Sequence, residues 1–220
     1  MQVRLTSNQL KLLALITMTV DHIGVQLLPQ YPLLRIIGRL AFPIYAYMIA
    51  EGCAHTRNRK NYLLQMAGLA LLCQLVYFFA MGSLFQCILV TFTLSIVTIF
   101  AIESPVSWHA PAAVCAVVFF TAILPHLLPY TDYAVDYGLL GVLLPVAVYL
   151  GKTPRQKLAL AAMVLALLAL DFGGNQWYGL AALLPLALYS GQRGEWKLKW
   201  LFYLYYPLHL AAIYGISLIL

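Results

Sequence analysis

Residues 17–60 read TMTVDHIGVQLLPQYPLLRIIGRLAFPIYAYMIAEGCAHTRNRK and predict two apolar helices that are joined at a turn flanked by Pro29 and Pro32. Ionisable side chains fall where lipid or packed helices should surround them: Asp21, His22, Arg35, Arg39, Glu51 and His55. A charge at the centre of a bilayer costs about 3 kcal/mol even on lenient insertion scales, so ionisable groups at such depth indicate function. This stretch therefore decides the fold and holds the first candidate site residues.

The composition is that of an integral membrane protein. Hydrophobic residues make up 63% of the 220 residues and charged residues 9%, and the mean hydropathy is +0.86. One soluble core of this length could not bury so much apolar surface. We therefore expect an all-α, polytopic helical bundle that forms one membrane domain over residues 1–220, with the lipid bilayer as its surroundings.

Neither a metal site nor a cleaved leader is indicated. The four cysteines lie inside apolar runs without the short paired spacing of a metal or redox site, so we expect them to pack as small hydrophobes. The first apolar run contains Asp21 and His22 and lacks a small-residue cleavage site, which favours an N-terminus that is kept. The formal charge of +6 is a topology signal rather than a sign of nucleic-acid binding.

Hydropathy and turn residues together predict nine spans. A spanning helix needs about 20 mostly apolar residues, and Gly, Pro, Asn and Ser mark the turns between them. No long polar segment interrupts the series, and the eighth span is short for a full crossing. The spans lie near residues 9–29, 32–55, 60–81, 84–103, 109–128, 134–151, 155–171, 176–190 and 198–220.

The basic residues predict the orientation, because short cytoplasmic loops are rich in Lys and Arg. With nine spans, the loops 30–31, 82–83, 129–133 and 172–175 contain no Lys or Arg and lie on the outer side. The N-terminus is then cytoplasmic and the C-terminus is outside. The basic residues that fall on the cytoplasmic side are Arg4, Lys11, Arg57, Arg59, Lys60, Lys152, Arg155, Lys157, Arg193, Lys197 and Lys199.

This topology brings four ionisable residues to a similar outer depth: Asp21 and His22 of the first span, and Arg35 and Arg39 of the second. The two arginines are four residues apart, so they share a helix face. A histidine beside a carboxylate and away from bulk water is a candidate general base. The alternative is that Asp21 and Arg39 only fix two helices together, while His22 bonds a carbonyl.

A second polar stripe follows the same helix toward the cytoplasm. Tyr47, Glu51 and His55 recur every four residues and stay on one side of the helix, where they could line an access path. An interfacial Glu–His pair explains the last two equally well. The basic residues Arg57, Arg59 and Lys60 follow directly and could bind the phosphates of an anionic substrate, although topology also explains them.

The final span carries a further group of polar side chains in YLYYPLHL at 203–210. Tyr205 and Tyr206 lie one turn before His209, and Pro207 disturbs the helix between them. Near mid-membrane this histidine could exchange a proton with a reacting oxygen. It could equally make a hydrogen bond that only joins two helices.

Six strings then occur in order along the chain: DHIG at 21–24, GRLAFPIYAYMIAEG at 38–52, HTRNRKNYLL at 55–64, DYGLLGVLLP at 136–145, LYSGQRG at 188–194 and FYLYYPLHL at 202–210. Their order over the whole length resembles the TraX family, first named for an F-pilin acetylase. That family looks like a branch of the transmembrane acyltransferases, with the acyltransferase-3 proteins and heparan-α-glucosaminide N-acetyltransferase.

The resemblance implies an enzyme of a bacterial cytoplasmic membrane that moves an acetyl group from cytoplasmic acetyl-CoA to an amine or hydroxyl on the outer side. By position, His22 matches the intramembrane histidine that serves the chemistry in those relatives. We expect His22 to act as base, with Asp21 holding or charging its ring. Arg39 would stabilise Asp21 or the developing oxyanion, and His209 or Tyr206 would supply a further donor to that oxyanion.

The residues predicted at the cytoplasmic end of the second span, here called the cytoplasmic group, are the candidates for binding the acetyl donor. For acetyl-CoA we expect a site formed by Arg57, Arg59, Lys60, Glu51, His55 and Tyr47. The resemblance names no acceptor, which could be a peptide amine, a sugar or another small molecule. The sequence also leaves open the acyl chain length, an acyl-enzyme intermediate and the oligomeric state, a homo-oligomer included.

Two other functions compete with acyl transfer. In a proton-coupled transporter or exporter, Asp21, His22, Glu51 and His55 would form a proton relay. Transporters commonly show two related halves, and no second copy of the Asp-His pattern follows residue 110. A non-catalytic scaffold of the membrane is the third reading, and it would need no buried charges.

Overall fold

The computed structural model describes residues 4–196 and 198–219. Lys197, one of the residues behind the predicted topology, lies outside this part of the chain, and the side chain of Lys199 is not described. Helices account for nearly all of the regular structure. In the described residues there is no β-strand, only the isolated bridges Leu5–Tyr189 and Gln86–Val135. The all-α prediction is therefore confirmed.

A helical segment lies at each of the nine predicted spans, and helix starts follow the local sequence. Thr6 and Gln9 form a capping box at the start of the first helix, and Asn58 caps the fourth. The segments are α1 (Ser7–Gln26), α2 (Pro32–Gly38) with α3 (Ala41–His55), α4 (Arg59–Met81), α5 (Ile88–Ile102), α6 (His109–Val118) with η1 (Phe119–Ile123) and α7 (Leu124–Leu127), α8 (Gly138–Leu150), α9 (Pro154–Phe172), η2 (Gly174–Ala182) with α10 (Leu183–Ala187), and α11 (Lys199–Ser217).

Three segments differ from a regular α-helix in ways that hydropathy does not predict. The second breaks after Gly38, so that Arg39 lies between α2 and α3. The fifth contains a π-helix, η1, between α6 and α7. The eighth is mostly a 3₁₀-helix, which rises about 2.0 Å per residue instead of 1.5 Å. The 14 residues of η2 and α10 can therefore extend roughly 25 Å, further than an α-helix of that length.

Apolar side chains cover the outside of several helices. Three described segments are long and apolar enough to cross a membrane: Pro32–His55, Arg59–Phe79 and His109–Leu127. The last two are mostly exposed, and α4 presents Leu71, Leu75 and Phe79 to its surroundings, the last at 80% exposure. So many exposed large hydrophobic side chains would be unfavourable in water, whereas they are favourable against lipid. The chain is therefore a membrane protein; nine crossings and their orientation remain predictions.

The chain forms two compact units. The first comprises Met1–Met48 with Ala161–Leu220, and the second comprises Ile49–Leu160. Both α3 and α9 begin in one unit and end in the other, so the backbone passes twice between them inside a helix. The expectation of a single membrane domain stays a prediction.

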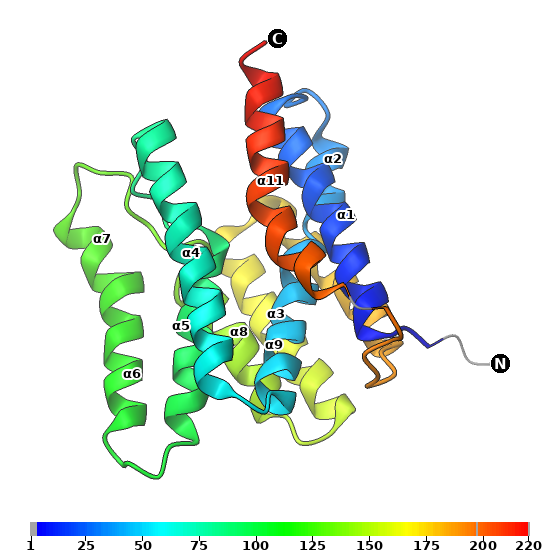
Figure 1. Cartoon of the computed structure of the whole chain (residues 1–220), viewed down its shortest axis with the longest axis vertical. Coiled ribbons are helices and arrows are strands. Elements are labelled where there is room, and N and C mark those ends of the chain that lie inside the picture. Colours follow the sequence, from blue (N-terminus) through cyan, green and yellow to red (C-terminus); the bar gives the residue numbers. More distant parts are fainter. Residues whose placement is uncertain (1–3, 197, 220) are drawn as a thin grey trace. The chain divides into compact units, whose positions relative to one another are not determined.

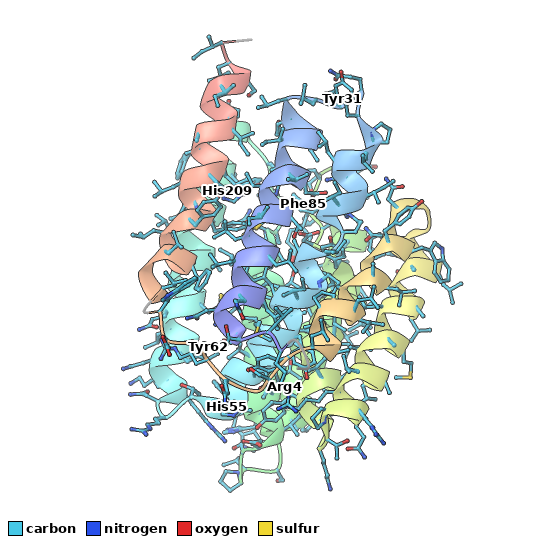
Figure 2. All side chains as sticks on the ribbon, turned by 90° about the vertical axis from the view of Figure 1, so that its right-hand side faces the viewer. Arg4, Tyr31, His55, Tyr62, Phe85 and His209 are labelled. Atoms are coloured by element: carbon cyan, nitrogen blue, oxygen red, sulfur yellow. The ribbon has the colours of Figure 1, made fainter. Side chains whose placement is uncertain are left out.

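In the first unit, α1 lies between α2 and α11 (Figure 1). The hydrogen bonds between α1 and α11 join Thr19 to Tyr205 and His22 to His209, so residue numbers rise together along the two helices. The two helices therefore run in the same direction, as predicted for the first and ninth spans. Figure 2 places His209 between Arg4 and Tyr31, which lie toward opposite ends of this unit.

In the second unit, α5 packs against α4, α6 and α8 (Figure 1). Ser95 of α5 donates to the backbone oxygen of Val142 in α8 at 2.9 Å, which satisfies a buried hydroxyl between helices. Two loops of the predicted outer side also meet here. The carboxylate of Asp132 accepts bonds from the Ser83 hydroxyl and the Leu84 N–H, and these bonds lower its pKa below the usual range.

Close contact between α1 and α2 depends on glycine. A Cβ placed on Gly38 would lie 2.1 Å from Oδ1 of Asp21, and one on Gly24 would lie 2.7 Å from Cβ of Leu34. Both distances are far below a van der Waals contact. Gly38 therefore lets the carboxylate of Asp21 reach the helix that carries the two arginines, as small residues do at helix contacts in membranes.

We predict that Gly38→Ala destabilises the protein by about 1–3 kcal/mol, because the new methyl group must displace the Asp21 side chain. Thermal unfolding in detergent measures the change. Gly215→Ala in α11 is the matched control, since nothing lies within 4 Å of a Cβ at that position. Equal melting temperatures for the two variants would show that the contact is not tight.

Candidate active site

The carboxylate of Asp21 binds two guanidinium groups. Nη2 of Arg39 donates to Oδ1 at 2.8 Å and to Oδ2 at 2.9 Å, and Nη1 of Arg35 donates to Oδ2 at 2.6 Å. Arg39 also donates from Nε to the backbone oxygen of Arg35 at 3.3 Å. Arg35 lies in α2 and Arg39 caps its C-terminal end, and their four-residue spacing lets both side chains reach Asp21 of α1. The structure thus joins Asp21 to both arginines, whereas His22, the fourth residue of similar predicted depth, binds His209.

This cluster is buried and carries a net positive charge. The side chains of Asp21 and Arg39 are 13% and 9% exposed, whereas that of Arg35 is 36% exposed. One carboxylate faces two guanidinium groups, so the three residues sum to one positive charge. Such a cluster favours a negative charge that develops nearby, and the low dielectric around it strengthens the effect.

His22, the neighbour of Asp21 on α1, binds a different partner. Its Nδ1 lies 2.8 Å from Nε2 of His209 in α11, and the ring centroids are 5.0 Å apart. His209 is buried, with 6% of its surface exposed, whereas His22 is partly exposed. The sequence singled out both histidines without indicating that they would pair, because they stand 187 positions apart.

Two tyrosines surround His209. The ring of Tyr205 stacks on the imidazole with centroids 5.0 Å apart, and the ring of Tyr206 meets it edge-on at 5.6 Å. The hydroxyl of Tyr205 lies 2.8 Å from Oγ1 of Thr19 in α1. Thr19 was missed by sequence reasoning, since a threonine in an apolar helix usually bonds only its own backbone, as it also does here to Leu15.

The predicted cytoplasmic group is divided between the two units. Tyr47 belongs to the first unit, where it is buried and its ring meets that of Tyr189 at 6.0 Å. Glu51 and His55 belong to the second unit. His55 donates from Nδ1 to the backbone oxygen of Glu51, and its side chain is 71% exposed. The three are thus not shown to line one path, and that role stays a prediction.

In the second unit, two basic residues form ion pairs that the sequence did not predict. Glu51 is buried and pairs with Lys157 of α9. Glu103, at the end of α5, binds both Arg59 and the Tyr149 hydroxyl. Neither pairing has a helical spacing, so no local pattern could have indicated it. Figure 2 labels His55 and Tyr62 of the second unit.

Two basic residues differ from Arg59 in their ion pairing. Arg57 and Lys60 are exposed, and in the described part of the chain neither makes an ion pair with an acidic side chain. Their charges remain available to an anionic ligand, whereas the charge of Arg59 is largely offset by Glu103. The predicted phosphate contacts therefore fit Arg57 and Lys60 better than Arg59.

A profile of the family described as TraX protein matches residues 6–217. The chain belongs to the TraX family. A relative from Dichelobacter nodosus, named probable fimbrial assembly protein FimC, serogroup H1, is 26% identical over 242 aligned positions, which cover 93% of each chain. An uncharacterized protein of Rickettsia prowazekii (strain Madrid E) is 53% identical over 38 residues, or 17% of this chain and 15% of its own. No solved structure matches.

For this TraX-family chain we predict that Asp21→Asn lowers the free energy of unfolding by about 3–5 kcal/mol, because it leaves Arg39 buried without a carboxylate. Arg35→Gln should cost no more than about 1 kcal/mol, since that guanidinium is a third exposed. Denaturant unfolding in detergent measures both. If the two variants are equally stable, the Asp21–Arg39 pair does not hold α1 and α2 together.

Proposed function

We propose that this protein is a membrane acetyltransferase that moves an acetyl group from cytoplasmic acetyl-CoA to an amine or hydroxyl acceptor on the outer side of the membrane. The observation that carries the proposal is the contact of His22 with His209 beside the Asp21–Arg39 pair. An ion pair of Asp21 with Arg39 that only joined two helices would not require two histidines in contact beside it. Membership of the TraX family supports the same reaction class.

In the proposed reaction, His22 is the general base. It takes the proton from the acceptor as the nucleophile attacks the thioester carbonyl, which forms the new C–N or C–O bond. The C–S bond then breaks, and the protonated imidazole returns its proton to the departing CoA thiolate. The sum is acetylated acceptor plus CoA, with no other reactant required.

The charges of Asp21, Arg35 and Arg39 suit the oxyanion that develops in this reaction. The thioester oxygen becomes negative as the nucleophile attacks, and the surplus positive charge of Asp21, Arg35 and Arg39 favours that change. Tyr206, which touches the ring of His209, brings a hydroxyl donor to the same region. Asp21 is bound to both arginines, so in this proposal it acts on the His22 ring through its charge.

For the donor, we propose that Arg57 and Lys60 bind the phosphates of acetyl-CoA from the cytoplasmic side. Both are exposed; Arg57 lies just after the end of α3, and Lys60 lies in the first turn of α4. Arg59 and Glu51 would support this site through their pairs with Glu103 and Lys157. Tyr47 and His55 belong to the same helix, α3, which begins two residues after Arg39.

The acceptor side rests on the relative from Dichelobacter nodosus, whose name assigns it to fimbrial assembly. The N-terminal amine of a pilin-type subunit is therefore the first acceptor to test. We further propose nine crossings, a cytoplasmic N-terminus and a bacterial cytoplasmic membrane as the location. The crossings and the orientation rest on the basic loops and would put the Asp21 cluster toward the acceptor side, whereas the location rests on the family match.

A proton-coupled transporter is the second candidate, and one observation favours it. Two hydrogen-bonded imidazoles beside a carboxylate could pass a proton as well as take one. Transport would require no acetyl-CoA, so binding of this ligand separates the two functions.

We predict that acetyl-CoA raises the melting temperature of the purified protein saturably, whereas ATP and acetate do not. A ligand that binds only the folded state at 100 times its dissociation constant stabilises it by about 2.7 kcal/mol. In Arg57→Ala with Lys60→Ala, the shift should need at least tenfold more acetyl-CoA.

Lys152→Ala with Arg155→Ala is the matched control, because it removes two exposed basic charges just before and in the first turn of α9, on the same predicted side. This control should respond like the wild type. A protein that melts cooperatively and shows no shift with acetyl-CoA or CoA would contradict the acetyltransferase and favour the transporter.

A further inference from the structure

The hydrogen bonds of His209 fix where its ring proton lies. Nδ1 of His209 is 2.8 Å from the backbone oxygen of Tyr205, one turn earlier in α11. A carbonyl oxygen only accepts hydrogen bonds, so Nδ1 must carry the proton and donate it. A neutral imidazole has a single N–H, and Nε2 of His209 is then an acceptor.

The position of the ring proton of His22 follows from that of His209. Its Nδ1 faces Nε2 of His209 at 2.8 Å, and two acceptors would not approach so closely. Nδ1 of His22 therefore carries the proton and donates it to His209. The second ring nitrogen of His22, Nε2, is left with a bare lone pair.

The nitrogen that carries this lone pair is not completely buried. In the described part of the chain, Nε2 of His22 makes no hydrogen bond, and no buried side-chain nitrogen or oxygen lacks a partner. It follows that Nε2 of His22 is not enclosed by protein. His209, by contrast, is almost fully buried and has both ring nitrogens engaged.

Two features support neutral imidazoles in which His22 donates to His209 and His209 donates to Tyr205. Arg35 and Arg39 already outnumber Asp21, so a further positive charge on either imidazole is opposed. A second bond also holds the helices in register: Thr19 gives its hydroxyl proton to Leu15, so its oxygen accepts from the Tyr205 hydroxyl. The same turn of α11 that binds Thr19 thus supplies the carbonyl that fixes His209.

We propose that His209 is a positioning residue, which holds His22 in the Nδ1–H tautomer and leaves Nε2 of His22 as the atom that takes the acceptor's proton. The proposal rests on the proposed acetyl transfer. Once Nε2 is protonated, the imidazolium still donates from Nδ1 to His209, which stabilises its charge. It then gives the Nε2 proton to the departing thiolate.

This assignment revises one role expected from the sequence. With Nδ1–H bound to Tyr205 and Nε2 accepting from His22, His209 has no N–H left for an oxyanion. That role falls to Arg39 and Tyr206. His209 therefore acts through His22 without touching the substrate.

Nitrogen NMR of the protein labelled with ¹⁵N-histidine tests the tautomer directly and without substrate. The chemical shift and one-bond proton coupling of each ring nitrogen show whether it carries a proton. The five histidines are assigned by replacing each in turn. We expect His22 and His209 to carry a proton on Nδ1 only, and His209→Ala to end the single tautomer of His22.

His209→Gln is the second variant, because its side-chain oxygen can still accept from Nδ1 of His22. We expect it to keep the His22 tautomer, and its melting temperature shows whether a loss in His209→Ala reflects unfolding. In acetyl transfer, His209→Ala should lower kcat at least tenfold with little change in KM for acetyl-CoA, and His209→Gln should recover part of that loss.

A proton on Nε2 of His22, an imidazolium at His209, or a His22 tautomer unchanged in folded His209→Ala would overturn the proposal. These results do not depend on acetyl-CoA. If the tautomer is as expected and no acetyl transfer is found, then the proposed function fails while the assignment of the histidines stands. If transfer is found with Nε2–H at His22, the assignment fails alone.

Discussion

The candidate site depends on one buried interaction, the carboxylate of Asp21 between the guanidinium groups of Arg35 and Arg39. Gly38 permits it, since any side chain there would collide with Asp21. Because Asp21 and His22 are consecutive in α1, fixing the carboxylate against α2 also fixes where the imidazole points. His22 then meets α11, and the helix rotation that satisfies one residue satisfies the other.

The helices could be predicted from the sequence because lipid requires every backbone polar group to bond within its own helix, so apolar length translates into helix. The Asp21–Arg39 contact followed from charge, spacing and topology. The His22–His209 pair did not, since it joins the first and last helices and has no local spacing. The same holds for Glu51 with Lys157, and the 3₁₀ geometry of η2 left no sign in hydropathy.

The two units use their charges differently. In the first unit, the cluster around Asp21 keeps a surplus positive charge in a buried setting, which favours a developing anion. In the second unit, Glu51 and Glu103 neutralise the basic residues nearest them, while Arg57 and Lys60 stay exposed and open to an anionic ligand. In an acetyltransferase the first arrangement serves the chemistry and the second serves donor binding. We therefore propose that α1, α2 and α11 carry the chemistry, and that the phosphates of acetyl-CoA bind at Arg57, after α3, and at Lys60, in the first turn of α4.

The release of CoA thiol from acetyl-CoA by the purified protein, with a free N-terminal peptide amine and a sugar hydroxyl supplied as acceptors, tests the central claim most directly. General-base catalysis contributes roughly 100- to 10,000-fold to a rate, so His22→Ala should lose at least that lower figure while acetyl-CoA still stabilises it. Thiol release at the same rate from wild type and His22→Ala would contradict the account, because the chemistry would then not pass through His22.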